Sequence, residues 1–184
     1  MIETKTESTA KKAWAFGLFV AAMLFMAAML FMADPAHAAT FNVNTTVDKV
    51  DDGHGDGFCA TGPFQVGTEP ECTLRAAIQE ANATSGADVI VVPAGTHELT
   101  ITGKDEDSSA TGDLDIRDGV TITGAGARET IIDGGGIDRT LHVPTIGGSI
   151  VPFTVNISGV KVTGGASANG AGGGIAQFSR GARI

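Results

Sequence analysis

Gly119-Val-Thr-Ile-Thr-Gly124 returns forty residues later as Gly159-Val-Lys-Val-Thr-Gly164. In both copies, aliphatic residues alternate with Thr or Lys between two glycines. This is the period-two pattern of a β-strand with one buried face. Thr140-Leu-His-Val143 falls halfway between the copies, so the pattern predicts a repeat of about 20 residues. Glycine at both ends fits sharp corners between short strands.

Similar strand-like runs occur along the rest of this region, at residues 88–93, 99–101, 114–116, 130–133 and 153–157. No gap between them is filled by a helical pattern, which argues against β-α-β units. Several strands per repeat instead favour an all-β chain coiled as a solenoid. An antiparallel sandwich with glycine-rich turns is the alternative.

Residues 73–83 carry a helical pattern, with Thr73 as a candidate N-cap and Gly86 as a stop. One face is apolar and is expected to cover the first coil of the solenoid: Leu74, Ala77, Ile78 and Ala81. The opposite face is polar and is expected to lie in water: Arg75, Gln79 and Glu80.

Cys59 and Cys72 are the two cysteines of the chain. Between them lie Gly and Pro residues of turn character, and the spacing lacks the C-x-x-C pairing of a metal site. In an exported chain this pattern predicts a disulfide.

The N-terminus reads as an export segment. Three lysines precede an apolar run from Ala13 to Ala33, and small residues at alternate positions follow at 36–38. We predict a signal peptide over residues 1–38, cleaved after Ala38. At about 1.5 Å per residue the run could also span a bilayer, so an uncleaved anchor is the alternative. Both place the rest of the chain outside the cytoplasm, with membrane contact only through this segment.

The chain is acidic, with 12 Lys and Arg against 21 Asp and Glu and a formal net charge of −9. It has no basic run in the part expected to be exported. Nucleic acid is therefore not an expected partner, because phosphate neutralisation needs clustered Lys and Arg.

Three stretches resemble the N-terminal motif of bacterial exported proteins named for Cys-Ser-Leu-Arg-Glu-Ala: residues 41–48, 56–59 and 72–82. Residues 111–116, 121–126 and 130–134 match the region C-terminal to the motif in that family. The resemblance implies a right-handed parallel β-helix of the pectate-lyase type with a short N-terminal capping helix, usually in large surface or secreted proteins. Thr73 and Ala76 stand where the name gives Ser and Glu, so no role for that Glu is carried over.

These observations predict three parts: the signal segment 1–38, a cap with the disulfide loop and helix at 39–86, and β-helix coils at 87–184. The last eight residues lack strand alternation, so we expect the coils to be cut short there. The expected function is an exported structural or binding module, adhesin-like, with a glycan or cell-surface ligand. A polysaccharide lyase or glycoside hydrolase of the same fold is the alternative.

We predict no catalytic residues. Asp51-Asp-Gly-His-Gly55 is similar to elements of pectin-hydrolysing β-helices, but adjacent carboxylates do not bracket a glycosidic bond. A lyase would need stacked carboxylates with a basic residue nearby. The candidates for such a lyase site are six charged residues of the coil region: Asp113, Asp115, Asp133, Asp138, Arg117 and Arg139.

No cofactor is expected beyond a weak calcium candidate. Residues 52–57 resemble the start of an EF-hand loop, but Pro63 stands where that loop needs Glu. An irregular Ca²⁺ site is the alternative to a solvated acidic turn, with ligands from Asp48, Asp51, Asp52 and Asp56. His97 and His142 are interpreted as isolated structural histidines, and residues 105–107 as a solvated loop.

Overall fold

The structure is a computed structural model that describes residues 37–63, 65–104, 106–145, 153–166 and 173–177. All of them belong to one compact unit, Ala36–Ile184. The apolar run of the predicted signal segment lies outside the described residues, and so do the last seven residues of the chain.

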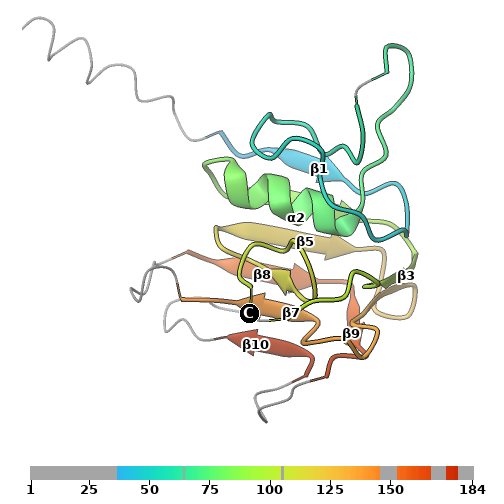
Figure 1. Cartoon of the computed structure of the whole chain (residues 1–184), viewed down its shortest axis with the longest axis vertical. Helices are drawn as coiled ribbons and strands as arrows, with labels where there is room; N and C mark the ends of the chain where they lie inside the picture. The colour runs from blue at the N-terminus through green and yellow to red at the C-terminus, as the bar shows by residue number, and fades with distance from the viewer. Residues whose placement is uncertain (1–36, 64, 105, 146–152, 167–172, 178–184) are drawn as a thin grey trace, which may run out of the picture. The chain divides into compact units, whose positions relative to one another are not determined.

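Short strands make up most of the regular structure of the described residues (Figure 1). The one helix among them, α2, covers Leu74–Ala83. The strands are β1 Thr40–Asn42, β2 Asp88–Val92, β3 Gly95–Glu98, β4 Leu114–Asp115, β5 Val120–Gly124, β6 Thr130–Asp133, β7 Leu141–Val143, β8 Val155–Ser158, β9 Lys161–Thr163 and β10 Ile175–Gln177. This content agrees with the all-β prediction.

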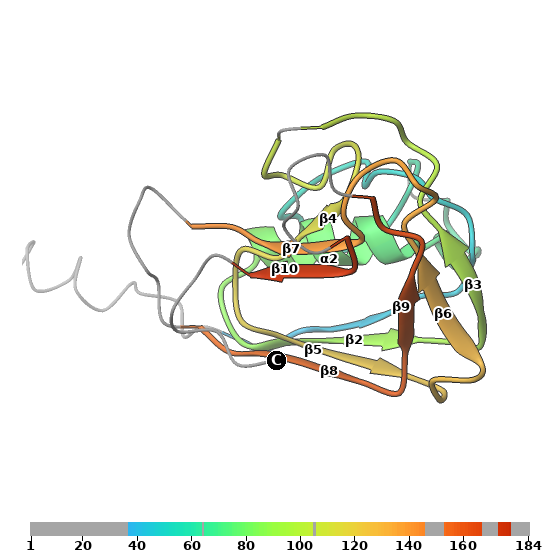
Figure 2. The ribbon, with the colours of Figure 1, turned by 90° about the horizontal axis from the view of Figure 1, so that it is seen from below.

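The strands form three sheets, with the orders β1-β2-β5-β8, β3-β6-β9 and β10-β7-β4 (Figure 2). Every strand pair among the described residues is parallel. From β2 onward, each strand pairs with the third strand after it in the chain. The antiparallel sandwich is therefore wrong.

The predicted repeat of about 20 residues is also wrong. Leu114 pairs with Leu141, 27 residues on, and Val120 pairs with Val155, 35 residues on. The two copies of the quoted motif lie in different sheets, because β5 belongs to the first sheet and β9 to the second.

The copies meet instead at their glycines. A Cβ on Gly124 would collide with the carbonyl oxygen of Gly159, and Gly159 itself has φ +66°. Glycine is required at both positions because the backbones approach too closely for a side chain.

Residues 99–101 are not a strand, although their aliphatic pattern predicted one. The N–H of Leu99 still donates to Asp133 O at 2.8 Å. The N–H groups of Thr100 and Ile101, however, donate to the Asp48 carboxylate at 2.7 and 3.0 Å. A side chain thus takes the donors that a neighbouring strand would otherwise pair. The strand lies just before, at β3, whose residues Gly-Thr-His-Glu carry little aliphatic signal.

The three sheets contribute to one hydrophobic core. In the first sheet Ile90 pairs with Ile122, and both are fully buried, while Thr121 and Thr123 are more exposed. The predicted alternation of inward aliphatic and outward hydroxyl side chains is confirmed for β5. The other two sheets add buried side chains to the same core, Ile132, Leu114, Leu141 and Val143.

Helix α2 begins as predicted. The Thr73 hydroxyl accepts a hydrogen bond from the N–H of Ala76 at 3.1 Å, and the helix ends at Ala83, before Gly86. Its apolar residues Leu74, Ala77, Ile78 and Ala81 are all buried. The helix contacts β1, β2 and β4. No helix among the described residues has the length and apolar character needed to cross a bilayer.

The polar face of α2 is not solvated, contrary to the sequence expectation. Arg75 is 0% exposed and forms an ion pair with Asp48 at 2.7 Å. Its guanidinium also donates to the carbonyl oxygens of Ser109, Gly112 and Asp113 at 2.8–3.3 Å. The side chain is buried because the loop that leads into β4 supplies acceptors for its donors.

Gln79 and Glu80 hold the loop that precedes the disulfide. Gln79 Oε1 accepts from the N–H of Asp51, and its amide donates to Ser109 O. Glu80 accepts from the N–H groups of Gly55 and Gly57 at 2.6 and 2.5 Å. Burial raises the pKa of Glu80, and these two hydrogen bonds oppose the shift.

The predicted disulfide between Cys59 and Cys72 is present, with an S–S distance of 2.01 Å. It joins the end of this loop to the residue before the N-cap of α2. A disulfide is typical of an oxidising compartment outside the cytoplasm.

Candidate functional site

A cluster of ionisable side chains lies on the face of β4 and β7 that points away from the core. Asp115 and His142 are register partners, so their side chains share one face of the sheet. Both are flanked by core residues, Leu114 on one strand and Leu141 and Val143 on the other. The cluster is nevertheless buried, with Asp115 at 0% and His142 at 5% exposure.

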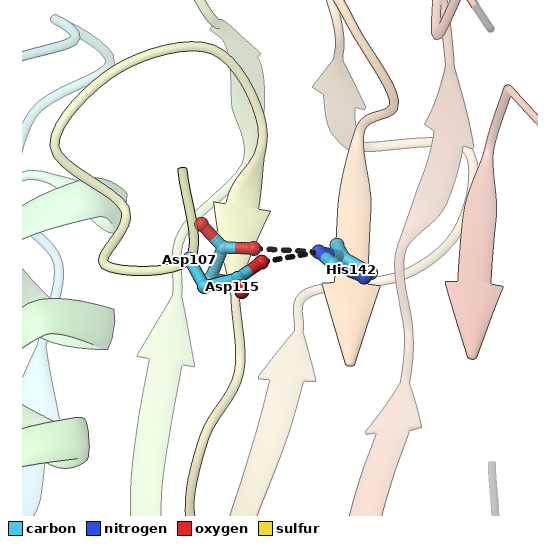
Figure 3. Close-up of side chains that lie close together, drawn as sticks. All are labelled: Asp107, Asp115 and His142. Atoms are coloured by element: carbon cyan, nitrogen blue, oxygen red, sulfur yellow. Dashed lines mark hydrogen bonds and ion pairs between the residues drawn. The ribbon is translucent and has the colours of Figure 1, made fainter. Parts of the chain in front are cut away.

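Three carboxylates surround the imidazole of His142. Its Nδ1 lies 2.7 Å from Asp115 Oδ1, 3.6 Å from Asp107 Oδ1 and 3.9 Å from Asp113 Oδ2. Figure 3 shows Asp107 and Asp115 side by side, both facing the imidazole from across the gap between the strands. Asp107 belongs to the loop before β4, and its side chain is 61% exposed.

Ser109 fastens this loop to β4. Its N–H donates to Asp115 Oδ2 at 3.1 Å, its hydroxyl donates to Asp115 O, and the N–H of Asp115 donates back to the hydroxyl. Ser109 has φ 57°, a left-handed conformation that costs a non-glycine residue energy. The three hydrogen bonds hold that conformation, and the loop thereby covers Asp115.

Arg139 brings the permanent positive charge of the described cluster. Its Nε lies 2.6 Å from Asp113 Oδ2 and 4.0 Å from Asp138 Oδ1. Burial raises the pKa of Asp113 to about 6, the charge of Asp115 adds to the shift, and Arg139 opposes it. Burial also raises the pKa of Asp115, against the hydrogen bond from His142.

Asp107, Asp115 and His142 form a group that could hold a metal ion. Their ligand atoms all lie within 4.8 Å of one another. Groups with exposed acidic members are common in proteins that bind no ion, so proximity alone does not assign a metal.

The sequence named most of these residues without placing them together. The structure gathers Asp113, Asp115, Asp138 and Arg139, four of the six lyase candidates. Asp133 and Arg117 are not part of the cluster: the Asp133 carboxylate accepts from the N–H of Gly135, and Arg117 is exposed.

His142 is not the isolated residue that the sequence suggested. Its alternation with Leu141 and Val143 is the signal that could have placed it on the outward face, but no local signal showed that β7 lies beside β4. Asp107 was interpreted as part of a solvated loop and does remain exposed. What the sequence missed is its proximity to the imidazole.

His97 does fit a structural interpretation. It is 3% exposed, and its Nε2 lies 3.3 Å from Pro93 O. Among the described residues its buried Nδ1 finds no partner. Burial lowers the pKa of His97, and the Pro93 carbonyl opposes the shift.

The four calcium candidates do not meet as a group of three donors within the described residues. Asp48 is bound by Arg75 and by two backbone N–H groups. Asp51 accepts from the N–H groups of Gly53 and Ala60, whereas Asp52 and Asp56 are exposed. The structure gives each of the two buried carboxylates a structural task, and the calcium site stays a prediction.

Comparison of the chain with family models, with curated proteins and with solved structures gives no match. Function is therefore argued from the residues of this chain.

Proposed function

We propose that this chain forms an exported right-handed parallel β-helix that binds a neutral glycan, in the manner of an adhesin. The strand order supports the coil, because three parallel sheets built from every third strand are what a three-sided solenoid produces. Parallel crossovers are right-handed in nearly all known cases, which supports the handedness. The resemblance to the Cys-Ser-Leu-Arg-Glu-Ala family points to the same architecture.

In this proposal α2 is the cap of the coil. The open end of a stack of parallel strands exposes aliphatic side chains and unpaired backbone groups. The apolar residues of α2 are buried, and the helix contacts strands of two different sheets. Export is supported by the N-terminal segment and by the disulfide.

The observation that carries the binding role is a cavity of about 340 Å³ beside the disulfide loop. It is within the size range of small-ligand sites. Phe58, which is 60% exposed, lies on its wall together with the carboxylate-bearing Asp52 and Asp56. An aromatic ring offers a flat face to a sugar ring, and carboxylates accept hydrogen bonds from sugar hydroxyls.

The cavity wall is held in place before any ligand arrives. Glu80 fixes the backbone at Gly55 and Gly57, Asp51 fixes it at Ala60, and Cys59 follows Phe58 directly. Such a loop loses little conformational entropy on binding. The two acidic side chains and the net charge of −9 oppose an acidic polysaccharide, so a neutral glycan is the better ligand.

The test is a glycan array probed with the chain and with Phe58→Ala. We expect binding to neutral glycans that Phe58→Ala abolishes. The matched control is Val66→Ala, which removes a side chain that is 96% exposed and does not line the cavity. Binding that survives Phe58→Ala, or that is confined to acidic glycans, would overturn the proposal.

The enzymatic alternative rests on one observation, the meeting of Asp113, Asp115 and Arg139 with a raised pKa at Asp113. Against it, both carboxylates are at most 1% exposed, which leaves a polysaccharide no access. Turnover of a polysaccharide that Asp113→Asn abolishes would favour a lyase or hydrolase over the binding module.

A further inference from the structure

We propose that Asp107, Asp115 and His142 bind one transition-metal ion, of which Zn²⁺ is the representative. The three residues come from the loop before β4, from β4 itself and from β7, and their donor atoms meet in one place (Figure 3). The inference is independent of the glycan-binding proposal, because the two sites share no residue.

The donor set decides the class of metal. Ca²⁺ and Mg²⁺ take oxygen ligands almost exclusively. An imidazole nitrogen with two carboxylate oxygens suits Zn²⁺ and its neighbours in the first transition row. This site is therefore chemically different from the calcium loop considered at Asp48–Asp56.

The spacing is close to what such an ion needs. Ligands at about 2.0–2.1 Å from a tetrahedral ion lie roughly 3.3 Å from one another. The 3.6 Å between His142 Nδ1 and Asp107 Oδ1 already fits. The 2.7 Å between Nδ1 and Asp115 Oδ1 is a hydrogen-bond distance, and it would widen as the ion replaces the shared proton.

The charge balance supplies an argument that does not depend on these distances. Asp115 is fully buried, and a buried carboxylate needs a positive partner. In the described ion pairs Arg139 Nε lies against Asp113 and Asp138, and neither Asp107 nor Asp115 is paired with it. Asp107, Asp113 and Asp115 all lie within 3.9 Å of one imidazole nitrogen. A divalent ion held by Asp107 and Asp115 would neutralise those two carboxylates.

Bound metal would tie the loop to β7. Asp107 is exposed and sits in the loop, whereas His142 is on a strand of the core sheet. An ion between them adds a cross-link where Asp107 Oδ1 and His142 Nδ1 now lie 3.6 Å apart, so loop opening would become slower when the metal is present.

The experiment is calorimetric titration of Zn²⁺ into the chain, expressed with its own N-terminal segment and freed of metal with a chelator. We expect one site. Asp107→Asn should lower the affinity for Zn²⁺ by at least about tenfold. Even residues that only hydrogen-bond to the ligands of a metal site change metal affinity about 10–100-fold when they are replaced. His142→Ala should abolish binding, and His54→Ala, which removes an exposed histidine, should leave it unchanged. Ca²⁺ at equal concentration should not compete.

Co²⁺ gives a readout at the ligands themselves. Its visible absorption should appear in the wild type and in His54→Ala, and disappear in His142→Ala. Because Asp107 is exposed, Asp107→Asn should still fold, and it keeps the test valid if His142→Ala does not. The proposal would be overturned if the titration of the wild type with Zn²⁺ released or absorbed no heat of binding. An unchanged Zn²⁺ affinity in Asp107→Asn, or loss of Zn²⁺ binding in His54→Ala, would overturn it as well.

Discussion

The polar face of α2 and the cluster at the loop before β4 both bury charged side chains, with Asp107 of the cluster as the exposed exception. Their charges are matched differently. On the helix, Arg75 meets Asp48 and three carbonyl oxygens, and Glu80 meets two backbone N–H groups. In the cluster, three carboxylates lie within 3.9 Å of one imidazole nitrogen. The paired charges of α2 stabilise the fold. The carboxylates around His142 outnumber their positive partners.

The strongest test of the helix side is Arg75→Ala. It leaves Asp48 and three buried carbonyl oxygens without their partner, and we expect it to lower the free energy of unfolding by about 3–5 kcal/mol. Urea denaturation with the disulfide intact measures this.

The control for Arg75→Ala is Lys49→Ala, at an ion pair with Glu71 whose side chains are 50% and 40% exposed. It should cost less than about 1 kcal/mol. Equal costs for the two variants would show that the buried pair does not hold the cap.

The apolar side of the same helix gives the second prediction. Ile78 is 1% exposed, so Ile78→Asp buries an unpaired charge and should cost more than about 2 kcal/mol. Ala83→Asp places the same charge at an exposed position at the end of α2 and should cost under about 1 kcal/mol. Similar denaturation midpoints for the two variants would mean that the apolar face is not a buried contact.

Asn82 links the two regions and gives a smaller effect. Its amide donates to Asp115 O and its carbonyl accepts from the N–H of Arg117, both at 2.7 Å. Asn82→Ala should therefore cost about 1–2 kcal/mol. The exposed Asn156, whose one hydrogen bond to Thr121 is 3.4 Å long, is the control. Asn156→Ala should lower the free energy of unfolding by less than about 0.5 kcal/mol. An equally small loss in Asn82→Ala would show that the two hydrogen bonds of Asn82 do not stabilise the contact between the two regions.

His97 belongs to neither region and gives the smallest effect, as a pH dependence. Burial places its folded pKa below the ordinary value of 6.5. The unfolded state therefore binds more protons as the pH falls. The contribution of His97 to stability is constant above about pH 6.5 and is lost as the pH drops from there through the folded pKa.

His97→Phe removes this decline, which contributes at most about 1.4 kcal/mol per pH unit. Denaturation of both proteins between pH 7.5 and 5 measures the difference. Parallel curves for wild type and His97→Phe would show that the side chain does not titrate in this way, and His54→Ala should follow the wild type.

Features that depend on neighbouring residues were predictable from the sequence. The N-cap at Thr73, the apolar stripe of α2 and the strand at β5 all follow from local spacing. The disulfide followed from the pairing of two cysteines in a chain expected to be exported. In each case the signal lies within a few residues of the element that it describes.

The predictions that failed concern features that depend on distant partners. The repeat was misjudged because loop length sets which strands stack, and the long loop between β3 and β4 has no counterpart in the local pattern. Arg75 was expected in water because its acceptors lie 34–38 residues away. For the same reason the alternation could mark Asp115 and His142 as outward-facing without showing that they are neighbours.

The separation in sequence between Arg75 and its acceptors also constrains the order in which the chain folds. Synthesis completes the helix sequence long before it reaches Gly112 and Asp113, whose carbonyl oxygens complete the guanidinium site. Until then a charged side chain has only part of its hydrogen bonds, and its burial is unfavourable. Helix α2 would thus reach its final packing late, with contacts of long sequence separation slowing that step.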